Sequence, residues 1–414
     1  MALVILFTAL LLASVALCPV AARLRLPLGA VAVAVGFGAA RALDALGVNT
    51  DLSWQHFSDL ILGLLVPVLL FDAALNLSLE GLRDRIGPLL WLGVPGYLVT
   101  TAVLGVVLHV LPAPGSLPAW TAAALAAGLV AALDADAAGP TVGRFAPGSG
   151  LQAMLEGEAL LTQVLAILLF ATVLQFSEAS PEPPAPAQAI VASATALGGG
   201  LAAGAMTGLI GLGLMFTFRG ARPCAVIALA TFVFTYALAV EFLHVSLAAA
   251  LVVAGFILGA GNRRLCHEDF MQELGAFGGF LARAFLFLLV GLTLDPMLLA
   301  GHWRPALLTL GTALAARAVA VFALLPLCAH TREWTPAGRA IAFWGGQRGA
   351  MNLALALALP PALGAQPVIQ AVVYALVGFS LWIQAPTLEP LVRLLHGLTP
   401  VSGGASPPAS TRAD

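Results

Sequence analysis

The chain has 414 residues, of which 60% are hydrophobic and 9% are charged, and its mean hydropathy is +1.00. Soluble domains carry roughly 25% charged residues, so this composition excludes a soluble globular enzyme and predicts a polytopic membrane protein whose partner is the lipid bilayer. The formal net charge is −2 and all 18 basic residues are arginine. The chain therefore has no basic field for nucleic acid, and we expect no such partner.

The apolar runs predict an all-α protein with about thirteen transmembrane helices, because a helix needs about 20 apolar residues to cross a bilayer. The predicted spans are 2–20, 27–46, 57–77, 86–111, 118–143, 150–177, 188–217, 223–242, 244–261, 271–294, 304–328, 336–359 and 367–396. No basic residue precedes the first span, so we interpret it as a retained helix rather than a signal peptide. The cut between the eighth and ninth spans, at Glu241 to His244, has the weakest signal.

The distribution of arginine predicts how the chain crosses the membrane. With thirteen spans, the odd-numbered connections contain thirteen arginines, and the opposite side contains two, Arg41 and Arg304. Cytoplasmic loops carry an excess of basic residues, which predicts an extracytoplasmic N-terminus and a cytoplasmic C-terminus in the cell (inner) membrane. We predict that the polar tail 399–414 is disordered.

An internal repeat divides the chain. The segment from Leu75 to Leu82 is similar to the segment from Leu292 to Leu299, at an offset of 217 residues. We expect residues 1–398 to form one transporter domain, with repeat one over about 1–177, a connector helix over about 188–217 and repeat two over about 223–396. Seven helices separate the two similar segments, so the copies are expected to be inverted, as in many secondary transporters.

The fifth span contains two acids followed by a Gly-Pro pair. Asp134 and Asp136 precede Gly139 and Pro140 near the middle of this span. Proline removes a helix hydrogen bond, so we expect the helix to unwind here. If the segment is extended, both carboxylates project to one side, and their repulsion favours a proton on one of them. The alternative interpretation is a cytoplasmic helix end with two solvated acids.

The twelfth span is the repeat partner of the fifth and contains a second candidate break. Three glycines surround Arg348, at positions 345, 346 and 349. Two crossed broken helices would leave free backbone groups and partial dipole charges, which Asp134 and Arg348 could offset.

Glu158 and Thr162 lie four residues apart in the sixth span, on one helix face. The apolar neighbours of Glu158 predict a buried ion pair, for which Arg348 is the first candidate partner and Arg317, in the eleventh span, is the second. Because a buried pair costs desolvation, we interpret these three residues as structural rather than catalytic.

These motifs, in this order, resemble the bacterial sodium/proton antiporters of the cation:proton antiporter superfamily, and specifically its electroneutral branch. The similar segments are Val68 to Leu75, Leu133-Asp134, Leu155 to Glu158, Ala316-Arg317 and Gly345 to Gly349. The resemblance implies thirteen spans, crossed broken helices, a homodimer, no cofactor and no metal other than a transported cation. It also implies a role in pH homeostasis.

The chain departs from this family at the ion site. The family's Asn-Asp pair, whose Asp binds the cation or the proton, is replaced by Thr162-Gln163, and glutamine cannot titrate. Asp134 is kept, and Asp72 stands where the family commonly has Glu. We therefore expect a cation and proton site centred on Asp134 and Asp136, with Asp72, Thr162 and Gln163 contributing to it.

Three functions remain open at this point. The first is exchange of a monovalent cation, Na⁺ or K⁺, for protons. The second is transport of another substrate by the same fold, because fold does not fix function. The third is a sensor or scaffold that has lost transport. No pairing of a nucleophile with a base appears in the sequence, so we do not expect an enzyme.

Overall fold

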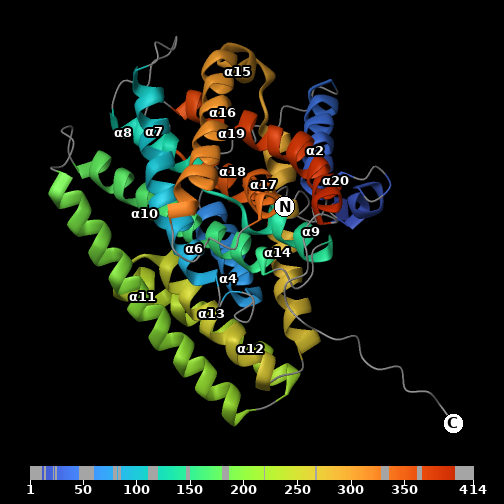
Figure 1. Ribbon diagram of the computed structural model, residues 1–414. Coiled ribbons are helices and arrows are strands. Elements are labelled where there is room, and N and C mark those ends of the chain that lie inside the picture. Colours follow the sequence, from blue (N-terminus) through green and yellow to red (C-terminus); the bar gives the residue numbers. More distant parts are fainter. Residues whose placement is uncertain are drawn as a thin grey trace.

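The computed structural model describes residues 26–45, 60–77, 85–110, 120–145, 150–179, 186–218, 220–265, 268–327, 335–360 and 366–396, together with most of residues 12–23 and Leu82. Every regular element of this part of the chain is helical. Figure 1 shows the helices packed into a single bundle, with the long helix α11 crossing one edge of it. The prediction of an all-α polytopic protein is confirmed.

The first half of the chain, up to the proposed connector, contains the helices α2 to α10. They are α2 (Leu28–Ala45), α4 (Val66–Asn76, continuing the π-helical turn Ile61–Leu65), α6 (Ile86–Trp91), α7 (Tyr97–Val110), α8 (Trp120–Ala131), α9 (Ala135–Phe145) and α10 (Leu151–Ala179). The π-helical turn Leu92–Gly96 joins α6 and α7 into one span. Single wide turns of this kind accommodate Pro95 inside the span.

The second half begins with α11 (Pro186–Thr217), the proposed connector. It continues with α12 (Ala221–Ala237), α13 (Leu247–Leu265), α14 (Glu268–Thr293), the short α15 (Pro296–Gly301), α16 (Trp303–Ala318), α17 (Pro336–Trp344), α18 (Ala350–Leu357), α19 (Gln366–Phe379) and α20 (Ala385–His396). The π-helical turns Leu238–Phe242, Val319–Leu324 and Ser380–Gln384 extend α12, extend α16 and join α19 to α20, respectively.

The predicted spans from the second to the thirteenth each coincide with a helix or a broken helix. Their observed ends differ from the predicted ends by only a few residues. Within the described residues, six helices are long and apolar enough to cross a membrane, and further apolar helical stretches are shorter. The first predicted span lies mostly outside the described residues, although residues 15–21 at its end are helical. The predicted tail 399–414 lies wholly outside them.

The weakest predicted cut, between the eighth and ninth spans, is confirmed. The chain leaves the helical path after Phe242 and resumes it at Leu247. His244 has a φ of 52°, in the left-handed region that ends a helix sharply. The backbone N–H of Ser246 donates to the Ala196 carbonyl of α11 at 3.0 Å, which fixes this corner against the connector helix.

The helix boundaries follow the repeat spacing. Asn76, the last residue of α4, and Thr293, the last residue of α14, are 217 residues apart. Ile86 and Trp303, which begin α6 and α16, are separated by the same distance in sequence. These boundaries support the repeat inferred from the sequence. The division of the transporter domain into two repeats and a connector helix stays a prediction.

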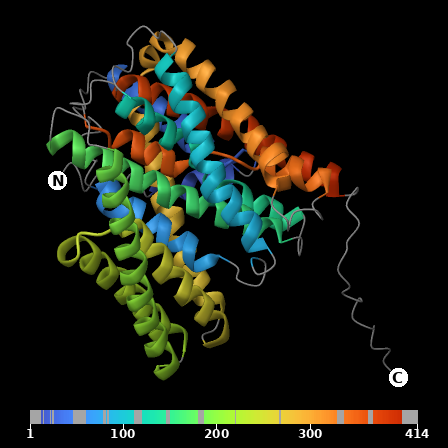
Figure 2. The same cartoon turned by 60° about the vertical axis from the view of Figure 1, so that its left-hand side comes forward.

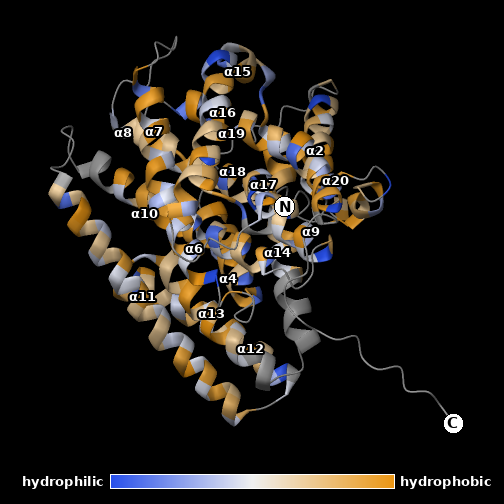
Figure 3. Ribbon diagram, in the orientation of Figure 1, coloured by the Kyte–Doolittle hydropathy of each residue, from blue (hydrophilic) through white to orange (hydrophobic). Residues whose placement is uncertain are grey.

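The bundle has an apolar outside and an apolar core that contains a small set of buried polar residues. Large apolar side chains are exposed along α7, α11, α12 and α16, and Figure 3 shows apolar colours on these helices. The buried polar residues include Asp72, Glu158, Gln163, Arg317 and Arg348, all inside the fold. This arrangement suits a protein surrounded by lipid, where ionisable groups face the bundle interior.

Two groups of helices are visible in Figures 1 and 2. Helices α11, α12 and α13 pack on one another at one end of the molecule, and α13 also packs on α4. The broken spans α8–α9 and α17–α18 lie in the other group, with α10, α16 and α19 around them.

Candidate functional site

The fifth span is broken at residues 132–134, between α8 and α9. The break frees backbone N–H groups, and two of those inside it each have a specific acceptor. The N–H of Leu133 donates to the Thr162 hydroxyl oxygen at 3.0 Å, and the N–H of Asp134 donates to the Gln347 carbonyl at 3.0 Å. The break is therefore held open by α10 on one side and by the other broken span on the other.

The position of this break differs from the prediction in one respect. Pro140 lies inside α9, so the Gly-Pro pair does not unwind the helix. Its missing N–H removes one bond to the carbonyl four residues earlier, and the helix tolerates that loss. Asp136 is consequently in the first turn of α9, and the extended geometry that would point it to the same side as Asp134 is not present. The side chain of Asp136 lies outside the described residues.

The twelfth span is broken where the glycines predicted it. Helix α17 ends at Trp344 and α18 begins at Ala350, with Gly345 to Gly349 between them. A Cβ atom at Gly349 would overlap the Asp134 carboxylate. Glycine at this position allows the carboxylate of one break to lie against the backbone of the other.

Asn352 ties the two breaks together. Its side-chain nitrogen donates to the Leu129 and Ala132 carbonyls, at 2.6 Å and 3.0 Å, and its side-chain oxygen accepts from the Gly349 N–H at 3.1 Å. The last carbonyls of α8 lack helical partners, and this buried amide satisfies two of them. The sequence analysis missed Asn352, although an amide next to a glycine break in an apolar span was an available signal.

Glu158 pairs with Arg317, the second of its two candidate partners. Both side chains are buried, and the two guanidinium nitrogens Nη1 and Nη2 of Arg317 contact the two carboxylate oxygens, with the Nη2–Oε2 distance at 3.0 Å. Nη2 also donates to the Ala342 carbonyl at 2.9 Å. A two-point geometry of this kind is the strongest form of the arginine–carboxylate contact.

Arg348, the first candidate, has other acceptors. Its Nε donates to the Val130 carbonyl at 3.2 Å and its Nη1 to the Gly346 carbonyl at 2.8 Å. The physical reason is the break itself, because the C-terminal end of α8 presents unpaired carbonyls and the negative end of a helix dipole. The Arg348 backbone N–H donates to the Ser380 hydroxyl at 3.1 Å, a contact that sequence reasoning also missed.

Two small cavities lie at the broken spans, and each has about 10 Å³ of space, enough for one water molecule or one bare ion. The first, which we call the aspartate cavity, is lined by Leu69, Ala73, Asp134, Gln163, Arg283, Ala350 and Met351. The second, which we call the glutamate cavity, is lined by Leu92, Gly96, Tyr97, Thr100, Ala131, Leu133, Glu158, Thr162, Arg317, Ala320 and Arg348.

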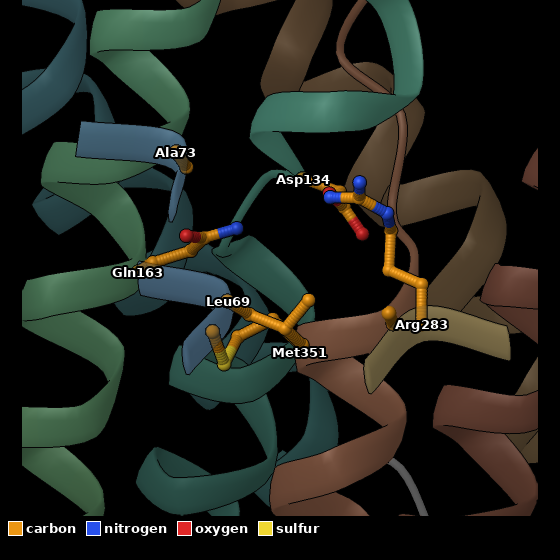
Figure 4. A pocket seen from close by; sticks show the side chains of 7 residues that line it. Leu69, Ala73, Asp134, Gln163, Arg283 and Met351 are labelled. Carbon is orange, nitrogen blue, oxygen red and sulfur yellow. The ribbon is translucent and has the colours of Figure 1, made fainter. Parts of the chain in front are cut away.

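The aspartate cavity brings together Asp134 and Gln163, as expected from the sequence. Figure 4 shows the Asp134 carboxylate reaching it from the first break, and the Gln163 amide facing it from α10 across the cavity. Arg283 of α14 also lines it, and the sequence analysis did not select this residue. An arginine inside an apolar span was the available signal.

Asp72 does not line either cavity, but it is buried on α4 beside Arg283. Its Oδ2 is 3.8 Å from Arg283 Nη1, and its Oδ1 accepts from the Asn76 side chain at 2.8 Å. A Cβ atom at Gly279 would overlap this carboxylate. Gly279 thus lets Asp72 lie directly against α14. Thr162, by contrast, lines the glutamate cavity, where its O–H donates to the Ala159 carbonyl at 2.9 Å.

Two broken helices in contact, with ionisable groups at the breaks and an apolar exterior, define a secondary transporter. The sequence pattern described as "Sodium/hydrogen exchanger, transmembrane" matches residues 10–394. The chain therefore belongs to the sodium/hydrogen exchanger family, whose members are transporters and not enzymes. It is a secondary active cation/proton antiporter of the monovalent cation:proton antiporter superfamily.

Individual relatives agree with this assignment. The chain is 30% identical over 361 residues to the Na⁺/H⁺ antiporter NhaP of Pseudomonas aeruginosa, covering 83% of each chain. It is 27% identical over 358 residues to the Na⁺/H⁺ antiporter NhaH of Halobacillus aidingensis, covering 82% of this chain and 84% of the relative. The fold is similar to that of the sodium proton antiporter MjNhaP1 of Methanocaldococcus jannaschii, with a TM-score of 0.76, 16% identity and coverage of 92% and 98%.

Proposed function

We propose that the transported cation and the proton compete for Asp134 in the aspartate cavity, and that this competition couples the two movements. The single observation that carries the proposal is the position of Asp134, in a helix break and on the wall of a cavity of one-ion size. A carboxylate that can hold a cation or a proton, but not both, exchanges the two without further machinery.

The ligands proposed for the cation are oxygens. Asp134 supplies the negative charge, and Gln163, on the opposite wall, supplies a neutral carbonyl oxygen. Hard monovalent cations prefer such ligands, as other hard cations do. Because the relatives above are named Na⁺/H⁺ antiporters, we propose Na⁺ as the first candidate substrate and K⁺ as the second.

The remaining candidate residues have supporting roles in this proposal. Asp136, two residues from Asp134 in the sequence, stays a candidate whose side chain lies outside the described residues. Thr162 holds the break open by accepting the Leu133 N–H. Glu158 and Arg317 form a structural pair, and Arg348 caps the end of α8.

We further propose a homodimer in the cell membrane, with the N-terminus outside and the C-terminus in the cytoplasm. The arginine distribution supports the orientation. The exposed apolar faces of α11 and α12, which form the outer side of one helix group, offer a surface for a second copy. We also propose electroneutral exchange, one cation for one proton, because a single carboxylate is the shared site.

A second candidate function rests on Gln163. The family's titrating aspartate is missing at this position, and an arginine lines the same cavity. These two features favour a relative that keeps the fold and binds no transported cation, or one that carries another substrate.

The experiment is an exchange assay in proteoliposomes with an internal acid gradient, read by a pH-sensitive dye. Adding Na⁺, K⁺ or Li⁺ to the unmodified protein dissipates the gradient if the proposal is correct, and Asp134→Asn abolishes the response. An unmodified protein that is silent with all three cations, but becomes active on Gln163→Asp, would support the non-transporting alternative.

A further inference from the structure

Arg283 is a charged residue on the wall of the aspartate cavity with no role in the function proposed above. It lies on α14, within a membrane span, and its side chain is 24% exposed. A permanent positive charge inside a span is unfavourable unless it has a partner, and arginine does not give up its proton there. Its position therefore calls for nearby negative groups.

One of these groups is Asp72, which is held in place from two sides. Asn76 donates to its carboxylate at 2.8 Å, and the bare backbone at Gly279 gives it room against α14. The 3.8 Å between its Oδ2 and Arg283 Nη1 is an ion pair at the long end of the range. The Arg283 guanidinium therefore lies close to Asp72 but does not form a short, two-point ion pair with it.

The other group is Asp134. Its carboxylate and the Arg283 guanidinium line the same small cavity, and Figure 4 shows both charged ends reaching into it while Gln163 faces them. An arginine side chain has several rotatable bonds, so a small rotation moves its charge between two neighbouring carboxylates.

The charges of this cluster have a simple sum. Asp72 and Asp134 carry two negative charges, Arg283 carries one positive charge, and Gln163 carries none. The cluster therefore carries a net charge of −1 and is one positive charge short of neutrality, which one monovalent cation or one proton supplies. An aspartate at position 163 would have left it two charges short instead.

We propose that Arg283 is a tethered counter-ion that the transported cation must displace. It contacts Asp134 when the cavity holds no cation and turns fully to Asp72 when a cation binds Asp134. Asp72 is then a positioning residue that acts through Arg283. This inference rests on the function proposed above, and it sets the strength of cation binding at the site.

The test measures cation binding directly, as the rise in melting temperature of the purified full-length protein with increasing Na⁺, K⁺ or Li⁺ at alkaline pH, where protons compete least. A ligand that binds only the folded state stabilises it by RT ln(1 + [L]/Kd), so the dependence of the melting temperature on cation concentration gives the dissociation constant. We compare Arg283→Gln, Asp72→Asn, the double variant, and Arg304→Gln as control. Arg304 is exposed, its guanidinium lies over the Trp303 ring, and it does not line the aspartate cavity.

The expected shifts have opposite signs. The dissociation constant of the cation falls by roughly ten-fold or more in Arg283→Gln, because a competing charge a few ångströms away is removed. It rises in Asp72→Asn, since Arg283 then has only Asp134 as partner. The double variant stays closer to Arg283→Gln than to the unmodified protein, and the control does not change.

The inference is overturned if Arg283→Gln binds the cation no more tightly than the unmodified protein, or if both single variants shift in the same direction. If Arg283→Gln does not fold, the double variant carries the test, and it must bind more tightly than Asp72→Asn alone. A gain of cation binding in Arg283→Gln, where the unmodified protein shows none, would support the inference while contradicting the proposed transport. If the unmodified protein exchanges cations for protons but Arg283→Gln leaves cation binding unchanged, the inference is contradicted and the proposed function is not.

Discussion

At the scale of single residues, the core depends on which acid faces which arginine. Glu158 and Arg317 are both buried and meet at two points, so neither charge is left uncompensated. Arg348 lies on the same cavity but uses its nitrogens on backbone carbonyls. The two arginines therefore have different functions, one in an ion pair and one in closing a helix end.

The first prediction follows from this difference. Arg317→Ala is expected to destabilise the detergent-solubilised protein by about 3–5 kcal/mol, because it strands a buried carboxylate. Glu158→Gln combined with Arg317→Ala is expected to recover part of the loss, measured by thermal unfolding in a double-mutant cycle with both single variants. Losses that simply add would show that the pair does not interact.

A glycine determines how closely the two breaks approach. A Cβ at Gly349 would overlap the Asp134 carboxylate, whereas nothing lies within 4 Å of a Cβ at Gly311 or Gly378. We predict that Gly349→Ala lowers exchange at least about ten-fold, since a shift of about 1 Å at a reacting group can cost two orders of magnitude. Gly311→Ala and Gly378→Ala serve as controls in the same flux assay. Equal effects at all three positions would contradict the close approach.

At the scale of elements, the two broken spans support each other through hydrogen bonds between them. The Asp134 N–H donates to Gln347, and Asn352 reaches back to the end of α8. A third element, α10, supplies the Thr162 hydroxyl to the Leu133 N–H. The unwound backbone is thus satisfied by protein groups, as it must be inside a membrane.

This arrangement predicts the effect of removing one hydroxyl. Thr162→Val keeps the shape of the side chain but leaves the buried Leu133 N–H without its acceptor, at a cost of about 1–3 kcal/mol. We expect a lower melting temperature and reduced exchange. Thr195→Val is the matched control, because the Thr195 hydroxyl bonds only within its own exposed helix turn. A loss no larger than in the control would contradict the role of Thr162.

The sequence predicts the existence of both breaks but not their contacts. Glycines mark the second break well, because Gly345 to Gly349 provide the close approach and the turn themselves. The first break precedes the Gly-Pro pair, since hydrogen bonds from Gln347 and Thr162 determine where the helix ends. The choice between Arg317 and Arg348 as partner of Glu158 depends on the same tertiary geometry, which no local pattern contains. Arg283 stands out in the sequence as an arginine inside an apolar span, but its proximity to Asp72 depends on the packing of α14 against α4.

At the scale of the whole molecule, many large apolar side chains are exposed, and three of the four buried charged residues in the described part of the chain line a cavity at the broken spans. The approximate limits of the described spans could be predicted from hydropathy, because the bilayer imposes a minimum length on each apolar run. The offset of 217 residues between similar segments reappears in the ends of α4 and α14. What hydropathy cannot show is how the short helices associate, since lipid and helix surfaces are equally apolar.

The orientation in the membrane is the prediction that belongs to this scale. Fusion of a reporter that is active only in the cytoplasm to the C-terminus is expected to give signal, and fusion to the N-terminus is expected to give none. The reason is the excess of arginine on one side of the span pattern. Signal from both ends would contradict the odd number of spans and the inversion of the repeat.

The most direct measurement of the central claim is proton release on cation binding, recorded with a pH indicator in weakly buffered solution of the purified protein. If the cation and the proton compete for Asp134, adding saturating Na⁺ at the pH where the site is half protonated releases about half a proton per chain, and less at higher pH, where fewer sites hold a proton. Asp134→Asn is expected to release none, while Arg304→Gln releases as much as the unmodified protein. Equal release from Asp134→Asn would show that the shared site is elsewhere.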